Sequence, residues 1–224
     1  SKWKKMEIKN RASNYEKMKD QMAEVFLQYD QEKMIQKFEL EHDKSYLYLY
    51  FIGRKYRIHR LTGAAAWSKD SFQTEEKADY NEAMTIYDVL CYSKEDCRLS
   101  HEWVNIDSCS SVQGGSLAKG NQFFGHAAEA FDGKETAFAA ACEKLGGRKI
   151  NKGDAAYDID MFPFLPVSLR YWASDEEFPA SLQILVDKNI LDYMHYETLM
   201  FAITHLLYRL RSECEEYEKT KAAL

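Results

Sequence analysis

Two blocks of alternating residues, separated and flanked by segments of helical period, constrain the fold of this chain most. In the first block, the run YLYLYF alternates tyrosine with aliphatic residues, and the tetrapeptides HDKS and IGRK on either side supply turn residues. Successive side chains of a strand point to opposite faces, so a period of two predicts strands. The short turns between them predict an antiparallel meander over residues 37–68.

The second block lies near the C-terminal end. Apolar residues alternate with polar ones at 157–161, and again at 167–171 and 182–186. The sequence FPFLP separates the first two runs, because a proline cannot donate the backbone hydrogen bond that a central strand requires. HEWVNIDS predicts one further short strand near Trp103. The second block therefore predicts a second group of strands.

Helical periods fill the remaining segments. Apolar residues recur every three or four positions at 11–29, 75–92 and 199–210, and Asp132 with Glu135 fits a capping pair for another helix. Two strand groups with helices between them and at both ends predict an α+β fold with antiparallel sheets. We expect a single domain over 1–224, made of a helical N-terminal arm 1–36, a strand meander 37–68, a helical middle 75–147 and C-terminal strands with a long helix 153–217.

Composition narrows the functional classes. The chain has 224 residues, of which 46% are hydrophobic, enough for a substantial core. Its formal net charge of −6 argues against a nucleic-acid partner, which usually requires a basic surface. No apolar run approaches the roughly 20 residues of a membrane helix, so no membrane partner is expected. The five cysteines are scattered without a C-x-x-C pair, which predicts reduced thiols in a cytoplasmic protein.

Familiar catalytic motifs are absent or incomplete. Residues 115–120 have the glycine spacing of a phosphate-binding loop, but Asn121 stands where that motif requires lysine. Lys119 keeps a weaker role in anion binding open. The six histidines form no metal-ligand motif, no G-x-S-x-G occurs, and His205 lies off the leucine stripe of its helix, which predicts a surface position. No metal site is therefore indicated, and these motifs do not identify a cofactor.

Carboxylates are the best remaining material for a site. Asp158 and Asp160 share one face of a predicted strand, where they chelate a divalent ion or simply meet water. Asp175 and Glu177 lie between Trp172 and Phe178, an arrangement that can shift a carboxyl pKa or merely form a hairpin corner.

The C-terminal sequence GDAAYDIDMFPFLPVSLRYWASDEEFPASLQILVD, together with FFGHAAEAF, CEKLGGRKINKGD and YFIGRKYRI, resembles a family of uncharacterised bacterial and archaeal proteins that is common in anaerobes. The family is known only as a domain of unknown function. The resemblance covers about Phe38 to Leu210, and it implies no established reaction. Some relatives carry an attached iron–sulphur segment of clustered cysteines. This chain lacks such a cluster, which argues against a direct role in electron transfer.

The first functional hypothesis is a binding or accessory module for a small ligand or a cofactor-related group. We predict that the ligand-binding residues are Trp172, Asp175, Glu177, Trp103, Trp67 and Asp154. A second hypothesis is an enzyme that uses Asp175 or Glu177 as acid or base, with a divalent cation and Asp154. A third is a protein-interaction module or homo-oligomer with an exposed aromatic patch.

Overall fold

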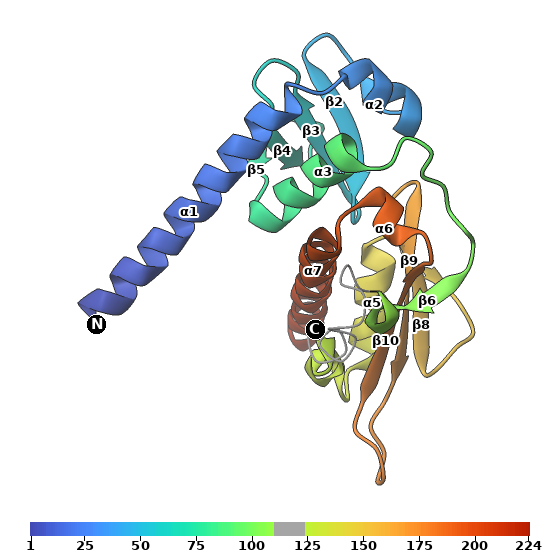
Figure 1. The fold of residues 1–224 in the computed structure, drawn as a ribbon. Coiled ribbons are helices and arrows are strands. Elements are labelled where there is room, and N and C mark those ends of the chain that lie inside the picture. Colours follow the sequence, from blue (N-terminus) through green and yellow to red (C-terminus); the bar gives the residue numbers. More distant parts are fainter. Residues whose placement is uncertain (110–123) are drawn as a thin grey trace. The chain divides into compact units, whose positions relative to one another are not determined.

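A computed structural model describes residues 1–109 and 124–224 (Figure 1). Their contacts divide the chain into two compact units. The first contains Ser1–Leu49 and Arg54–Ser93, and the second contains Tyr50–Gly53 and Lys94–Leu224. The single domain expected from the sequence stays a prediction. The segment with the glycine-rich loop and Lys119 lies outside the described residues.

A five-stranded sheet in the order β1-β2-β3-β4-β5 confirms the predicted meander, since strands that follow one another in sequence are neighbours. The strands are β1 (Glu41–His42), β2 (Tyr46–Phe51), β3 (Arg54–His59), β4 (Ala65–Ser68) and β5 (Glu76–Lys77). The meander begins later than predicted because helix α2 (Gln31–Phe38) includes its first residues and ends at Glu39, whose backbone is left-handed (φ 52°).

Helix α3 (Tyr80–Tyr92) packs against this sheet. The hydroxyl of Tyr87 donates to the carbonyl of Gly63 at 2.6 Å, and the hydroxyl of Tyr56 on β3 donates to the carboxylate of Glu82. The helix begins later than its apolar pattern predicts, because Glu76–Lys77 pair with β4 and Asp79 caps the helix through the backbone N–H of Glu82. Sheet pairing and capping therefore set its start.

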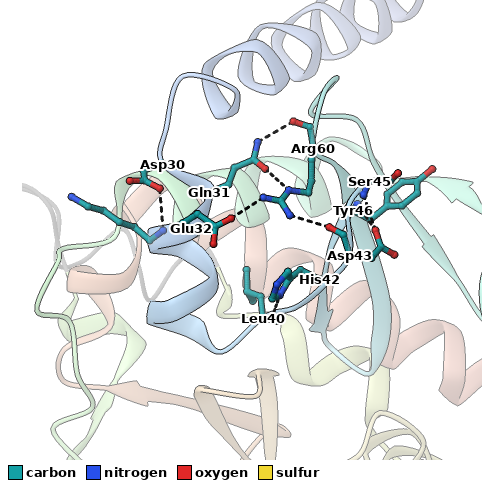
Figure 2. A network of polar contacts seen from close by, with 10 residues as sticks. Asp30, Gln31, Glu32, Leu40, His42, Asp43, Ser45, Tyr46 and Arg60 are labelled. Atoms are coloured by element: carbon teal, nitrogen blue, oxygen red, sulfur yellow. Dashed lines mark hydrogen bonds and ion pairs between the residues drawn. The ribbon is translucent and has the colours of Figure 1, made fainter.

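Arg60, directly after β3, forms hydrogen bonds with α2 and with the turn at Asp43 (Figure 2). Its guanidinium donates to the side chain of Gln31 at 3.0 Å, to that of Glu32 at 3.0 Å and to the backbone carbonyl of Asp43 at 2.9 Å. The side-chain amide of Gln31 returns a hydrogen bond to the Arg60 carbonyl at 3.0 Å. One arginine thus joins three segments that are distant in sequence.

Helix α1 (Lys2–Phe26) is longer than the predicted helix, and residues 1–18 are exposed. Its C-terminal part approaches Gly63, which has a left-handed φ of 74°. A Cβ atom at this glycine would lie 2.3 Å from the carbonyl oxygen of Ala23. The absence of a side chain at Gly63 therefore permits the close contact between α1 and the turn before β4.

The second sheet has the order β6-β10-β9-β8-β7 and is antiparallel. Its strands are β6 (Trp103–Asn105), β7 (Arg148–Lys149), β8 (Ala155–Phe162), β9 (Leu165–Trp172) and β10 (Ser181–Asp187). The predicted second strand group and the short strand near Trp103 are thereby confirmed. Two antiparallel sheets with helices confirm the α+β class.

Helices cover one face of the second sheet (Figure 1). They are the 3-10 segments η1 (Ile106–Ser108) and η2 (Ala127–Phe131) and the helices α5 (Glu135–Lys144), α6 (Ile190–Tyr193) and α7 (Tyr196–Ala222). The Tyr171 ring packs 5.3 Å from that of Phe138 on α5, and its hydroxyl donates to the carbonyl of Phe131 on η2. The predicted capping pair is wrong. Lys134 is the N-cap of α5, whereas the carboxylate of Asp132 accepts a hydrogen bond from the Ser174 hydroxyl at 2.8 Å.

His205 is buried rather than exposed as predicted, with 2% of its surface accessible. Its ring stacks on Phe51 at 5.6 Å, and one turn further along α7 the guanidinium of Arg209 donates to the carbonyl of Ile52 at 2.7 Å. Residues 50–53 therefore contact a second face of α7, which the leucine stripe does not reveal. Within the described residues, no helix combines the length and apolar character needed to cross a membrane.

Gly63→Ala tests the contact with α1. We expect it to lower the free energy of unfolding by at least about 1 kcal/mol more than Gly133→Ala does, as measured by urea denaturation. Gly133 is a matched control, because its φ is 73° but no atom lies within 4 Å of its added Cβ. Equal losses in the two variants would contradict a specific contact between Gly63 and α1.

Candidate functional site

The strand register places two predicted site residues on one face of the second sheet. Trp172 pairs with Ser181, and Trp103 pairs with Asp187. Ser181 and Asp187 are six residues apart on β10, so their side chains point to the same side. This side is opposite to the one that carries Tyr171 toward α5. We call it the polar face, and its residues include Trp103, Asp158, Ser168, Arg170 and Trp172.

The two tryptophans lie at opposite ends of the polar face. Six residues along β10 span roughly 20 Å. Beside Trp172, the carboxylate of Asp154 accepts a hydrogen bond from the backbone N–H of Ala173 at 2.7 Å. A Cβ atom on Gly153 would lie 3.1 Å from the Trp172 indole. The structure therefore brings Asp154 and Trp172 together, but not Trp103.

The other three predicted residues, Trp67, Asp175 and Glu177, do not lie on the polar face. Trp67 belongs to the first unit, where it is 6% exposed with the guanidinium of Arg54 lying 3.7 Å from its ring centre. Asp175 and Glu177 lie in the exposed loop between β9 and β10. The Asp175 carboxylate accepts the backbone N–H groups of Glu177 at 2.8 Å and Phe178 at 2.7 Å. Asp175 thus closes a local turn of the hairpin.

Three polar side chains meet near the centre of the polar face. Asp158 on β8 pairs with Ser168 on β9, and Arg170 follows Ser168 on the same side. Each has an atom shielded from solvent that lacks a hydrogen-bond partner in the described part of the chain, namely Asp158 Oδ1, Ser168 Oγ and Arg170 Nε. Asp160, by contrast, binds the guanidinium of Arg148 through two hydrogen bonds of 2.9 and 3.0 Å. Asp158 and Asp160 therefore share a face of β8, as predicted, but Asp160 is bound to Arg148 whereas Asp158 lies beside Ser168.

Asp187, at the end of β10, is a buried carboxylate with a structural role. It accepts hydrogen bonds from the backbone N–H groups of Ser100, His101 and Asn189 and from the Ser100 hydroxyl, at 2.9 to 3.0 Å. Burial raises its pKa, but these hydrogen bonds outweigh burial and lower the pKa below the ordinary value of 3.8. Asp187 therefore ties the segment before β6 to the end of β10.

Glu82 is the corresponding buried carboxyl of the first unit, and it is 2% exposed. It accepts hydrogen bonds from the Tyr56 hydroxyl and from the backbone N–H of Asp79, and Arg54 lies 3.5 Å away. Burial and then the negative charge of Asp79 raise the pKa of Glu82. Its reciprocal hydrogen bonds with Asp79 form a capping box. The Asp-x-x-Glu spacing at residues 79–82 was the sequence signal for this arrangement.

A concave site lies elsewhere in the second unit, between η2 and α7. The pocket has a volume of about 320 Å³ and is lined by Phe124, His126, Ala127, Ala130, Phe131, Thr204, Leu207 and Arg211. We call it the η2–α7 pocket. Phe131 is held by a ring contact of 5.0 Å with Phe138 and by the Tyr171 hydroxyl, which donates to its carbonyl. The pocket is therefore built on a packed part of the core.

The polar groups of this pocket are only partly engaged. Nδ1 of His126 lies 2.8 Å from a carboxylate oxygen of Glu129. The side chains of Thr204 and Arg211 make no hydrogen bond or ion pair with another described residue. The η2–α7 pocket therefore combines apolar walls with unpaired polar groups.

The first unit contains a groove of about 440 Å³, which has fewer features of a ligand-binding site than the η2–α7 pocket. It lies between α1 and the segments around β4 and α3, and alanines form much of its lining. The amine of Lys19 is already bound there, since it donates to the carbonyl of Ala78 at 2.7 Å and pairs with Glu16 at 3.0 Å. The remaining charged groups give no converging set of ligand contacts.

Burial raises the pKa of most of the cysteine thiols, and the described residues contain no cluster of metal ligands. All five cysteines remain outside disulfide bonds. Burial and the nearby charge of Asp88 raise the pKa of Cys91 to about 12, so this thiol stays protonated near neutral pH. Among the residues that the structure describes, no three His, Cys, Asp or Glu side chains are arranged as metal ligands.

None of the six predicted ligand-binding residues lines the η2–α7 pocket. Sequence reasoning missed Thr204 and Arg211, although a signal exists. Residues 204, 207 and 211 recur at helical spacing and share one face of α7. The leucine stripe of the same helix dominated the sequence pattern and concealed this face.

The chain belongs to the family described as Domain of unknown function (DUF3786), whose sequence profile matches residues 30–209. Helix α1 lies outside the matched residues. No curated protein and no solved structure matches this chain.

Asp187→Asn tests the structural carboxylate. At pH 7 we expect a loss of about 2 kcal/mol in the free energy of unfolding, because charge-assisted hydrogen bonds are removed. The folded pKa lies below the unfolded value, so the charge stabilises the fold above about pH 4 and this contribution is lost as the pH falls through the folded pKa.

Urea denaturation at pH 7 and pH 3 measures both effects. The difference between wild type and Asp187→Asn should shrink at the lower pH. Glu176→Gln, in the exposed β9–β10 loop, serves as the control and should change little. A difference that does not depend on pH would contradict the assigned role of the charge.

Proposed function

We propose that the protein is a binding module for a small organic molecule and that the η2–α7 pocket is its site. The observation that carries this proposal is the combination of an apolar floor with unpaired polar groups on α7. Phe131 and Leu207 are buried, whereas Thr204 is half-buried and Arg211 is exposed. Small-molecule sites commonly have volumes of about 300–1,000 Å³ and pair apolar walls with a few placed polar groups.

This proposed site differs from the one predicted from the sequence around Trp172, Asp175 and Glu177. The Asp175 carboxylate is occupied by its own turn, which weakens its assignment as a catalytic acid or base. The enzymatic alternative with a divalent cation stays a hypothesis without a defined site. A cytoplasmic location, the bacterial and archaeal distribution of the family and the iron–sulphur segments of relatives also stay predictions.

The third hypothesis, a protein-interaction module, has one observation in its favour. The side chains of Asp158, Ser168 and Arg170 lie together on the polar face, and each has a shielded polar atom without a hydrogen-bond partner among the residues that the structure describes. An unpaired polar atom shielded from water is costly, and a partner chain that rearranged these side chains would relieve that cost. Sedimentation of the wild-type protein over a range of concentrations tests for a homo-oligomer of this kind.

Ala130→Trp tests the ligand-binding proposal by filling the pocket. We expect a thermal-shift screen of metabolites, nucleotides and cofactors to yield at least one compound that raises the Tm of the wild type. A ligand at 100 times its Kd stabilises a protein by about 2.7 kcal/mol. Ala130→Trp should lose most of this shift, with at least a tenfold weaker Kd by calorimetry.

Ala139→Trp is the matched control, because Ala139 is half-buried on α5 and does not line the pocket. It should keep the ligand response. A screen without hits would contradict the proposed function. A response that survives in Ala130→Trp but disappears in Asp175→Asn or Glu177→Gln would return the site to the β9–β10 hairpin.

A further inference from the structure

We infer that the η2–α7 pocket takes an amphipathic anion, with an apolar group on the pocket floor and a carboxylate or phosphate bound by Arg211 and Thr204. This inference rests on the proposed function and adds the chemical class of the ligand. It is carried by the placement of these two side chains on α7 and by their lack of hydrogen-bond or ion-pair partners among residues 1–109 and 124–224.

The two polar residues are placed to act on one ligand. Thr204, Leu207 and Arg211 occupy positions i, i+3 and i+7 of α7, and all three line the pocket. Two helical turns separate Thr204 from Arg211, about 10 Å along the axis. Side chains of a helix generally incline toward its N-terminus, and this direction would carry the long Arg211 side chain over Leu207 toward Thr204.

Several other arginines of this protein bind carboxylates through their guanidinium groups. Arg57 binds Glu75 at 2.9 Å, Arg60 binds Glu32 at 3.0 Å, and Arg148 binds Asp160 through two hydrogen bonds. Arg211 has no such bond to a described residue. A guanidinium presents paired N–H groups that match the oxygens of a carboxylate or phosphate. An unpaired guanidinium at the rim of an apolar pocket therefore selects for an oxyanion.

The remaining lining fits the same class of ligand. None of the described residues that line the pocket carries a carboxylate, so a cationic ligand would find no counter-charge among them. Glu129, which neighbours the lining residue Ala130 in sequence, has its carboxylate 2.8 Å from Nδ1 of His126. Phe124 and Phe131 provide aromatic walls for an apolar body. A volume of about 320 Å³ lies at the lower end of the range of about 300–1,000 Å³ that is common for small-molecule sites, which favours a small ligand.

Calorimetry with three related compounds tests this inference on the full chain. Phenylacetate and phenyl phosphate carry the anion, and phenylacetamide is the neutral counterpart of the first. We expect the wild type to bind at least one anion no less than tenfold more tightly than the amide. The better of the two anions identifies the head group as carboxylate or phosphate.

Variants on α7 connect the preference to the proposed residues. Arg211→Gln should reduce the affinity for the anion at least tenfold and leave that for the amide unchanged. Thr204→Val should reduce the anion affinity about fivefold, as expected for the loss of one hydrogen bond. Lys219→Gln is the control, because Lys219 is an exposed cation of the same helix outside the pocket, and it should behave as the wild type.

The results separate the two proposals. Equal binding of the anions and the amide, lost in Ala130→Trp, would overturn the anionic class and leave the ligand-binding function standing. An anion preference that survives in Arg211→Gln would also overturn the inference. If none of the three compounds binds while neutral compounds from the screen do, the class is wrong. If no compound of any kind binds, the proposed function itself fails.

Discussion

The second sheet depends on burying one face of β8, β9 and β10. Tyr157, Leu169 and Tyr171 lie on that face, and the hydroxyls of the two tyrosines reach α5 and η2. This packing fixes Phe131, which in turn forms the floor of the η2–α7 pocket. The same register places Trp172 and Asp158 on the opposite, polar face. One packing requirement therefore determines both surfaces that are considered for binding.

Carboxylates in this protein mainly organise the backbone. Asp187 receives four hydrogen bonds, Asp175 closes its own turn, and Glu82 belongs to a capping box with Asp79. Such roles satisfy backbone N–H groups that would otherwise be left unpaired. An acidic residue that stands out in the sequence, such as Asp175, is therefore weak evidence for a functional site in this protein. A side chain such as that of Arg211, which makes no hydrogen bond or ion pair within the described ranges, is a better guide because its donors are available to a ligand.

Much of the fold was predictable from local patterns, whereas the pocket was not. Alternation at residues 46–51 and 155–162 predicted strands, and the structure confirms both as β2 and β8. His205 shows the limit of such reasoning. Its position off the leucine stripe indicated exposure, but contact with Phe51 buries it. A one-dimensional pattern records the first packing face of a helix and gives no sign of a second partner that is distant in sequence.

The sequence by itself determined the periods of two and of three to four, and with them the strands, the helices and the α+β class. It also determined the residue types near the β9–β10 turn. Only the tertiary structure decided that Trp103 and Trp172 lie at opposite ends of one face, and that Thr204 and Arg211 border a cavity. The physical reason is that strand or helix formation depends on neighbouring residues, whereas a pocket depends on which distant segments pack together.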